Sequence, residues 1–215
     1  MKRSLFLSMV AIATMAFIGC QENKVCRIHG TIVGEQYEGK RIFLVPFTGP
    51  ATAETVDSME IKNGKFEFAP DSMQMYKILL DYHYRFATQP LIVIAEPGDI
   101  QVTIDSVSSA KGTPQNDSLQ VWKEMTEKIG KERLALNRLI AAKKQQNDTV
   151  EAANIKAQVK KMHLKYKKRS RAMAANMEGT VLGDFLKGMF PLTYKRQMPD
   201  GSVVTMDADT DEPVK

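Results

Sequence analysis

Few residues of this chain combine a reactive side chain with a spacing that enzymes use. The chain has two cysteines, Cys20 and Cys26, and three histidines, His29, His83 and His163. The histidines are scattered and do not show the spacing of metal ligands. The sequence contains no G-x-S-x-G, P-loop or H-E-x-x-H motif. It therefore predicts no catalytic residue, no metal site and no cofactor.

Cys20 is the residue whose surroundings predict a chemical modification. Lys2 and Arg3 precede an uncharged, largely apolar run that ends at Gly19, which is the pattern of a secretory signal peptide. The four residues that end in Cys20 resemble the signal of bacterial lipoproteins. That resemblance implies a diacylglycerol thioether on the Cys20 thiol, cleavage just before Cys20, and acylation of the new amino group.

The resemblance fixes the expected location of the chain. Residues 1–19 are then a signal peptide and residues 20–24 a short polar tether, with membrane lipid as the partner of Cys20. Two or more acyl chains anchor a protein stably, so we expect a lipid-anchored protein of the bacterial cell envelope, with the outer membrane favoured. The inner membrane is left open as the alternative, and so is the side that the protein faces. An ordinary cleaved signal is the first alternative, and a retained helix is disfavoured because spanning takes about 20 apolar residues.

Cys26 is a candidate free thiol. With Cys20 lipidated, the chain offers Cys26 no intramolecular disulfide partner, although export places it in an oxidising compartment. A leftover thiol there could pair between molecules. Burial is the simpler expectation, because free cysteine is among the most buried residue types.

Residues 25–115 show the pattern of an antiparallel β-sandwich. Short apolar or alternating runs are separated by Gly, Pro and Asn turns. The expected strands are 26–33, 41–47, 55–62, 65–69, 76–82, 91–95 and 100–105. Asn63-Gly64 supplies the two positive-φ residues of a type I′ hairpin turn. The apolar residues on either side of that turn then share one face: Met59, Ile61, Phe66 and Phe68.

Three strings of the sequence carry a family resemblance. They are VDSMEIKNGKFEF at 56–68, PLIVIAEPGDI at 90–100 and KGTPQN at 111–116. Together they resemble the uncharacterised N-terminal β-domain of bacterial thioredoxin-like, thiol–disulfide interchange lipoproteins. In that family a helical segment leads on to a thioredoxin domain. This sequence has no cysteine after Cys26 and no Cys-x-x-Cys, so we expect the redox half to be absent and do not transfer its activity.

Residues 116–192 are expected to form a long antiparallel helical hairpin followed by a short apolar helix. Apolar residues recur at three- and four-residue spacing on both sides of a polar break at 145–147. Asp117 with Gln120, and Asp148 with Glu151, resemble helix-capping boxes. The fold class is therefore α+β, and residues 193–215 are expected to be a partly disordered tail.

The helical hairpin concentrates the positive charge of the chain. Residues 118–178 hold fifteen Lys and Arg against six Asp and Glu. Export and the lack of interleaved aromatic residues argue against nucleic acid as a partner. A solvated helix face is the simplest interpretation, and contact with anionic lipid headgroups is the alternative.

Two further features could contribute to binding. Tyr76, Tyr82, Tyr84 and Phe86 form a candidate patch for a small molecule or glycan. Glu96 and Asp99 flank Pro97-Gly98, which is more simply a turn than a cation site.

The expected function is a membrane-anchored lipoprotein with a non-catalytic binding or scaffold β-domain for an envelope protein, peptide or glycan. The alternative is an accessory or truncated member of a thioredoxin-like thiol–disulfide system. The oligomeric state is not predicted.

Overall fold

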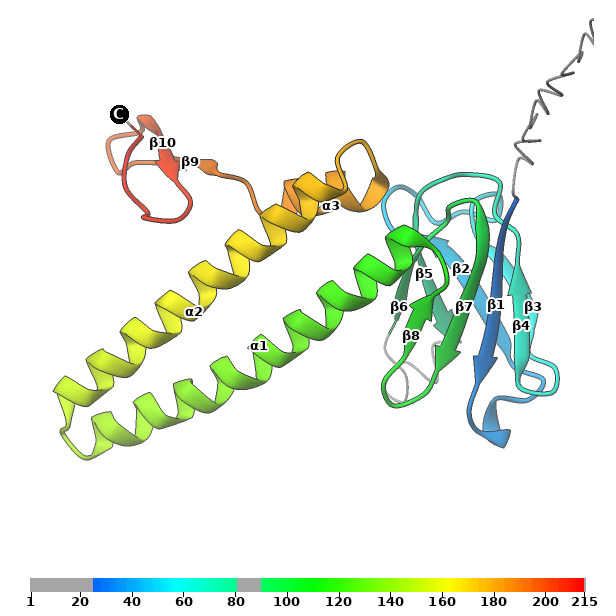
Figure 1. The fold of residues 1–215 in the computed structure, drawn as a ribbon, viewed down its shortest axis with the longest axis horizontal. Helices are drawn as coiled ribbons and strands as arrows, with labels where there is room; N and C mark the ends of the chain where they lie inside the picture. Colours follow the sequence, from blue (N-terminus) through cyan, green and yellow to red (C-terminus); the bar gives the residue numbers. More distant parts are fainter. Residues whose placement is uncertain (1–24, 81–89, 215) are drawn as a thin grey trace, which may run out of the picture.

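The computed structural model describes residues 25–80 and 90–214, in which two β-sheets pack at one end and a long helical hairpin projects from them (Figure 1). This architecture confirms the predicted α+β class, with a β-sandwich followed by a helical hairpin. The lipidation candidate Cys20, and His83, Tyr82, Tyr84 and Phe86, lie outside the described residues.

The first sheet has the strand order β4-β1-β7-β8. Its strands are β1 (Cys26–Ile32), β4 (Lys65–Phe68), β7 (Gly98–Ile104) and β8 (Ser109–Lys111). β1 pairs with β4 in antiparallel fashion and with β7 in parallel, in the register Ile28 to Ile100. One parallel pair therefore interrupts the expected antiparallel pattern. β8 was not predicted from the sequence.

The second sheet has the order β3-β2-β5-β6 and is antiparallel throughout. Its strands are β2 (Arg41–Pro46), β3 (Asp57–Glu60), β5 (Met75–Leu80) and β6 (Leu91–Ile94). A 3-10 turn, Glu35–Tyr37, precedes β2 and buries Tyr37.

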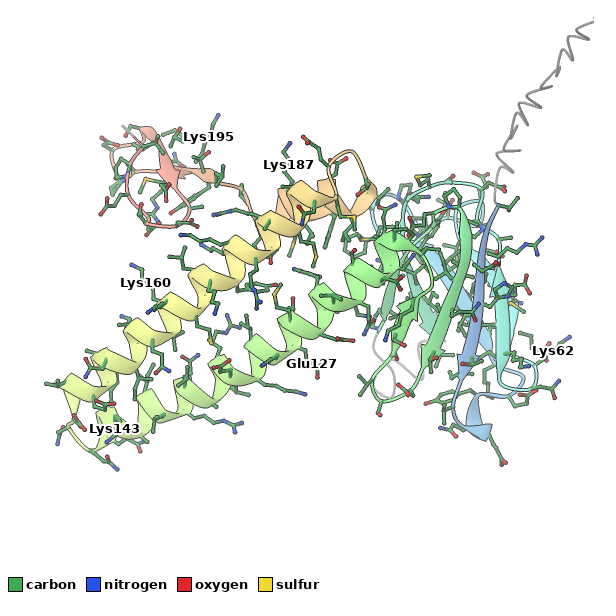
Figure 2. The ribbon with its side chains drawn as sticks, viewed as in Figure 1. Lys62, Glu127, Lys143, Lys160, Lys187 and Lys195 are labelled. Carbon is green, nitrogen blue, oxygen red and sulfur yellow. The ribbon has the colours of Figure 1, made fainter. Side chains whose placement is uncertain are left out.

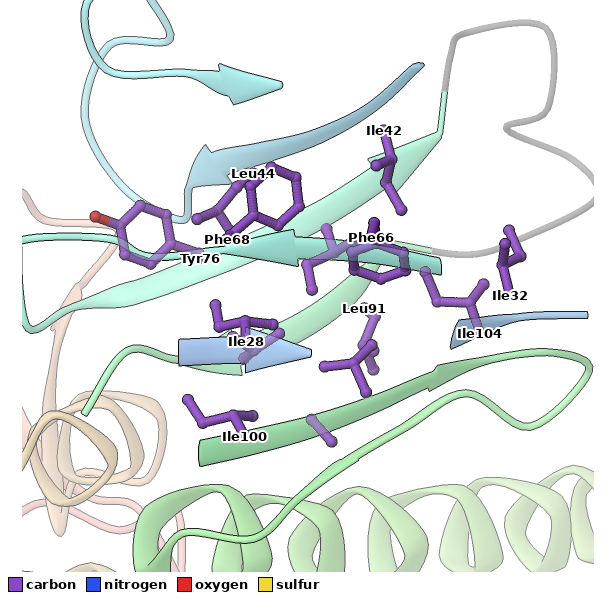
Figure 3. Close-up of a cluster of buried hydrophobic side chains, with 14 of the residues drawn as sticks. Ile28, Ile32, Ile42, Leu44, Phe66, Phe68, Tyr76, Leu91, Ile100 and Ile104 are labelled. Carbon is purple, nitrogen blue, oxygen red and sulfur yellow. The ribbon is translucent and has the colours of Figure 1, made fainter. Parts of the chain in front are cut away.

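The main core lies between the two sheets (Figure 3). Alternation along the strands turns every second side chain inward, as in β1, where Ile28 is 0% exposed and Ile32 is 6% exposed. Gly30 lies between them under the Phe66 ring, whose Cζ would stand 1.9 Å from an added Cβ. The aromatic ring of β4 thus fills the space that a side chain on β1 would occupy.

The Asn63-Gly64 turn forms as predicted but joins two different sheets. Asn63 has φ 53° and Gly64 has φ 66°, and both backbone N–H groups donate to the Glu38 carboxylate, at 2.8 and 3.0 Å. Beyond the turn the strands diverge, because β3 pairs with β2 and β4 pairs with β1. The predicted hairpin is therefore a corner of the sandwich.

The helical hairpin consists of α1 (Pro114–Gln145) and α2 (Thr149–Asn176). Its seam includes two side-chain hydrogen bonds. Trp122 Nε1 donates to Ser170 Oγ at 3.2 Å, and the hydroxyls of Thr126 and Tyr166 lie 2.8 Å apart. The predicted cap of α2 is confirmed, since the Asp148 carboxylate accepts from the Glu151 N–H. The predicted cap at Asp117 is wrong, because α1 begins earlier, at Pro114, and Asp117 instead accepts from the Gly112 N–H.

A second core forms where the short helix α3 (Val181–Met189) packs between the helical hairpin and the sandwich. Its buried members are Met75 and Ile94 from the second sheet, Leu119 and Trp122 from α1, and Leu182 and Leu186 from α3. Among the described residues, none of the helices is both long and apolar enough to span a membrane.

The C-terminal tail is ordered, contrary to the expectation of partial disorder. Residues 193–207 form the C-terminal hairpin, made of β9 (Thr193–Gln197) and β10 (Val203–Asp207). Met206, on β10, is 3% exposed. Arg171 of α2 donates to both oxygens of Asp209 at 2.8 Å, and Lys167 Nζ donates to the Ala208 carbonyl at 2.6 Å. One ion pair and one hydrogen bond to α2 therefore hold this segment in place.

Two glycines of α3 give a matched test of this packing. An added Cβ at Gly183 would stand 2.0 Å from the Met177 carbonyl oxygen, whereas Gly188 has open space around it. We expect Gly183→Ala to lower the free energy of unfolding by about 1–3 kcal/mol. Gly188→Ala should instead raise it by about 0.5 kcal/mol, because alanine favours the helix. Urea unfolding measures both changes, and equal effects would contradict the close approach of α3 to the end of α2.

Candidate functional site

A buried carboxylate joins the sandwich to the helical hairpin. Glu96 follows β6 and is 7% exposed. Its carboxylate accepts hydrogen bonds from the backbone N–H groups of Gln115, at 2.8 Å, and Asn116, at 3.3 Å. These groups belong to the first turn of α1, whose N–H groups have no partner within the helix. Glu96 is therefore the cap of α1, and its negative charge suits the positive end of the helix dipole.

Asn116 completes this connection. We call the hydrogen-bonded group of Glu96, Gln115 and Asn116 the arm joint. Asn116 is fully buried, and its side-chain amide accepts from the Ile94 N–H at 2.9 Å and donates to the Ile94 carbonyl at 2.7 Å. The amide thus pairs with the edge of β6 as a neighbouring strand would. On the side of α3, the Gln115 side-chain oxygen accepts from the Leu182 N–H at 3.0 Å. The arm joint consequently fixes β6, α1 and α3 to one another.

Glu96 and Asp99 do not come together as a cation site, because the Glu96 carboxylate caps α1 in the arm joint. Asp99 lies on β7 instead, where its carboxylate is 3.2 Å from His29 Nε2. Within residues 25–80 and 90–214, no three His, Cys, Asp or Glu side chains are grouped so as to hold a metal ion.

Cys26 is a buried free thiol at the start of β1. It is 8% exposed and lies at the wall of a small hollow that also includes Glu96. Burial raises the pKa of the Cys26 thiol above its ordinary value. A high pKa keeps the group in the thiol form, which is a poor nucleophile.

A hollow lies at the rim of the sandwich, and we call it the rim hollow. It has a volume of about 620 Å³ and is lined by residues of the 44–57 and 69–76 segments. Thr55 makes the first segment rigid, because its hydroxyl donates to the Pro50 carbonyl at 2.8 Å and accepts from the Thr52 N–H at 2.9 Å. A preformed wall of this kind is typical of ligand sites.

The chemistry of the rim hollow is that of an acidic edge over an apolar floor. Leu44 and Tyr76 contribute to its floor, and Glu54, Asp57 and Asp71 to its edge. None of these three carboxylates forms an ion pair with another described residue. The arrangement suits a ligand with positively charged or hydrogen-bond-donating groups.

Tyr76 is the one member of the candidate aromatic patch that the structure describes. It is only 6% exposed, and its hydroxyl accepts from Gln74 Nε2 at 2.8 Å. Its ring belongs to the main core (Figure 3), so it contributes to the rim hollow from below and not as an exposed stacking surface.

The basic residues of α2 divide into two groups. Lys167 and Arg171 bind Ala208 and Asp209, which directly follow the C-terminal hairpin. Arg171 also donates to the carbonyls of Phe190 and Pro191, at 3.0 and 2.8 Å. Lys160 projects from the side of α2 that faces away from α1 (Figure 2). Next to it, burial and the nearby charges of Lys167 and Arg133 lower the pKa of His163. Part of the positive charge that the sequence concentrates in the helical hairpin is therefore structural.

Comparison with protein families finds one match. Residues 26–119 match the model described as "Domain of unknown function (DUF4369)". The match covers less than half of the chain, yet it spans the whole sandwich and both sides of the arm joint, including Glu96 and Asn116. Comparisons with curated proteins and with solved structures found no match.

The arm joint can be tested by replacing its carboxylate. Glu96→Gln puts an NH₂ group against backbone N–H donors, so we expect the free energy of unfolding to fall by about 1–3 kcal/mol. Amide exchange should accelerate first at Gln115 and Asn116. The control is Glu67→Gln on the exposed side of β4, where an exposed pair with His29 contributes at most about 1 kcal/mol. Equal losses in the two variants would contradict the capping role.

Proposed function

We propose that this protein is an exported, membrane-anchored lipoprotein whose β-sandwich is a non-catalytic binding domain. The observation that carries the binding role is the rim hollow, with its apolar floor, rigid wall and unpaired carboxylates in the described part of the chain. Carboxylates at the edge favour a peptide segment that bears Lys or Arg over a neutral glycan. The ligand is accordingly a basic segment of another cell-envelope protein.

The arm joint supports a scaffold role for the same molecule. A 32-residue helix such as α1 extends about 48 Å, and α1 starts after only Gly112 and Thr113 beyond β8. Because Glu96 and Asn116 fix its first turn, the helical hairpin is a rigid arm on the binding domain. A rigid arm holds two surfaces of one protein at a constant separation.

The anchoring part of the proposal rests on the residues around Cys20. A charged start, an apolar run and a Gly before the cysteine fit a lipoprotein signal. The link to thioredoxin-like lipoproteins rests on the three resembling strings. An accessory thiol role has less support, since the remaining thiol, Cys26, is buried and its pKa is raised.

Intact-mass analysis of the full chain extracted from membranes tests the anchor. We expect loss of residues 1–19 and added mass for a diacylglycerol group and a further acyl chain on Cys20, with Cys26 reduced. The Cys20→Ala variant should carry no acyl mass. A cleaved chain without lipid, or a chain of full unmodified mass, would overturn the anchored form.

Charge reversal at the rim hollow tests the binding role. In the lipidated chain, we expect Glu54→Lys with Asp71→Lys to raise the dissociation constant of a Lys-rich peptide, measured by fluorescence anisotropy, by about tenfold, equivalent to about 1.4 kcal/mol. The matched control is Glu132→Lys, an exposed acid on α1. An unchanged dissociation constant in the rim variant, or an equal rise in the control, would remove the rim hollow as the site.

A further inference from the structure

The helical hairpin carries an apolar groove along one side of its seam, which we call the hairpin groove. It has a volume of about 450 Å³ and runs between α1 and α2. Val121 at its edge is 57% exposed, although it is a large apolar residue. The other apolar lining residues are Met125, Ala172, Met173 and Met177.

The groove exists because two helices alone do not cover their own apolar stripes. A globular helix buries a stripe about 100° wide, and one neighbour covers only part of it. Near the sandwich, α3 covers the Trp122 side, where the Phe185 ring meets the Trp122 indole edge-on at 5.8 Å. Met125, Met173 and Met177 contact this cluster as well, but part of each also faces the groove. Methionine side chains adapt to the shape of whatever packs on them.

The charges at the groove select the kind of partner. Arg169 lines the groove and is exposed. Lys165, one turn earlier on α2, and Lys128, three residues after Met125 on α1, share its side of the helices. None of the three has an ion-pair or hydrogen-bond partner among the described residues. Glu132 follows on the same side of α1, and Glu124 lies one turn before Lys128, where it accepts from Gln120 Nε2 at 3.0 Å. Three basic residues therefore stand against two acids, and the flanks of the groove are net positive.

We propose that the hairpin groove is the docking site for an amphipathic helix of a partner protein whose apolar stripe is flanked by Glu or Asp. The partner's apolar side chains pack on the three methionines and Val121, completing a three-helix layer. Its carboxylates pair with Arg169, Lys165 and Lys128. A second copy of this hairpin is a poor occupant, because α1 and α2 are both rich in Lys and Arg. The groove differs from the rim hollow in position, shape and sign of charge.

Two synthetic helices of about 18 residues, about 27 Å long, serve as probes. Both carry the same leucine stripe, flanked by Glu in one and by Lys in the other. The full lipidated chain is held in nanodiscs of phosphatidylcholine, and empty nanodiscs are the blank. Fluorescence anisotropy measures each dissociation constant. We expect the Glu-flanked helix to bind at least tenfold more tightly than the Lys-flanked helix, and more weakly at high salt.

Charge reversal at the groove makes the test specific. Lys165→Glu with Arg169→Glu should weaken the Glu-flanked helix by about tenfold and strengthen the Lys-flanked helix. Lys156→Glu with Lys160→Glu has the same spacing on another side of α2 and should leave both constants unchanged. Equal binding of the two probes, or an equal response to both variants, would overturn the proposal. Two further outcomes would also overturn it. A dimer that the groove variant dissociates would assign the surface to a second copy of the chain. Release of the probe by phosphatidylglycerol vesicles, to the same extent from the groove variant and from the control variant, would assign the surface to lipid.

Discussion

The first turn of a helix has backbone N–H groups with no partner inside the helix, and burying them unpaired costs free energy. In α1 this turn is buried against the sandwich, and the Glu96 carboxylate accepts from two of its N–H groups. Asn116 uses the same turn to cover the backbone edge of β6 at Ile94. The direction of the whole helical hairpin follows from these few bonds, because only Gly112 and Thr113 separate α1 from β8.

β6 shows how the two cores depend on that joint. Its four residues are apolar without alternation, which is expected of a strand covered on both faces. Leu91 and Val93 face the core between the sheets, whereas Ile94, with Ile92 beside it, packs against α1 and α3. Removing the helices would expose the second face of β6. The sandwich and the helical hairpin therefore stabilise each other and are not independent modules.

Local features of the fold could be predicted from the sequence, whereas long-range ones could not. Asn63-Gly64 was predicted to be a type I′ turn because two positive-φ residues are a local requirement. That β3 and β4 separate into different sheets depends on partners distant in sequence, so alternation could not reveal it. Glu96 lies beside Pro97-Gly98, and the turn signal concealed its role as a cap for a helix that begins 18 residues later. The tail was predicted to be partly disordered from its composition, and a single bidentate Arg171–Asp209 pair, with Met206 buried, orders it.

The sandwich rim and the hairpin groove carry charge of opposite sign. Arg171 of α2 pairs with Asp209, just after the C-terminal hairpin, so the positive charge on that side of the helix is partly neutralised within the molecule. Lys165 and Arg169 are left without such partners in the described chain, beside an apolar groove. The sandwich rim carries the opposite sign, in Glu54, Asp57 and Asp71. Because hydrogen bonds of Glu96 and Asn116 hold α1 to β6, we expect the acidic hollow and the basic groove to keep a constant separation, so that the two proposed sites take partners of opposite charge at the same time.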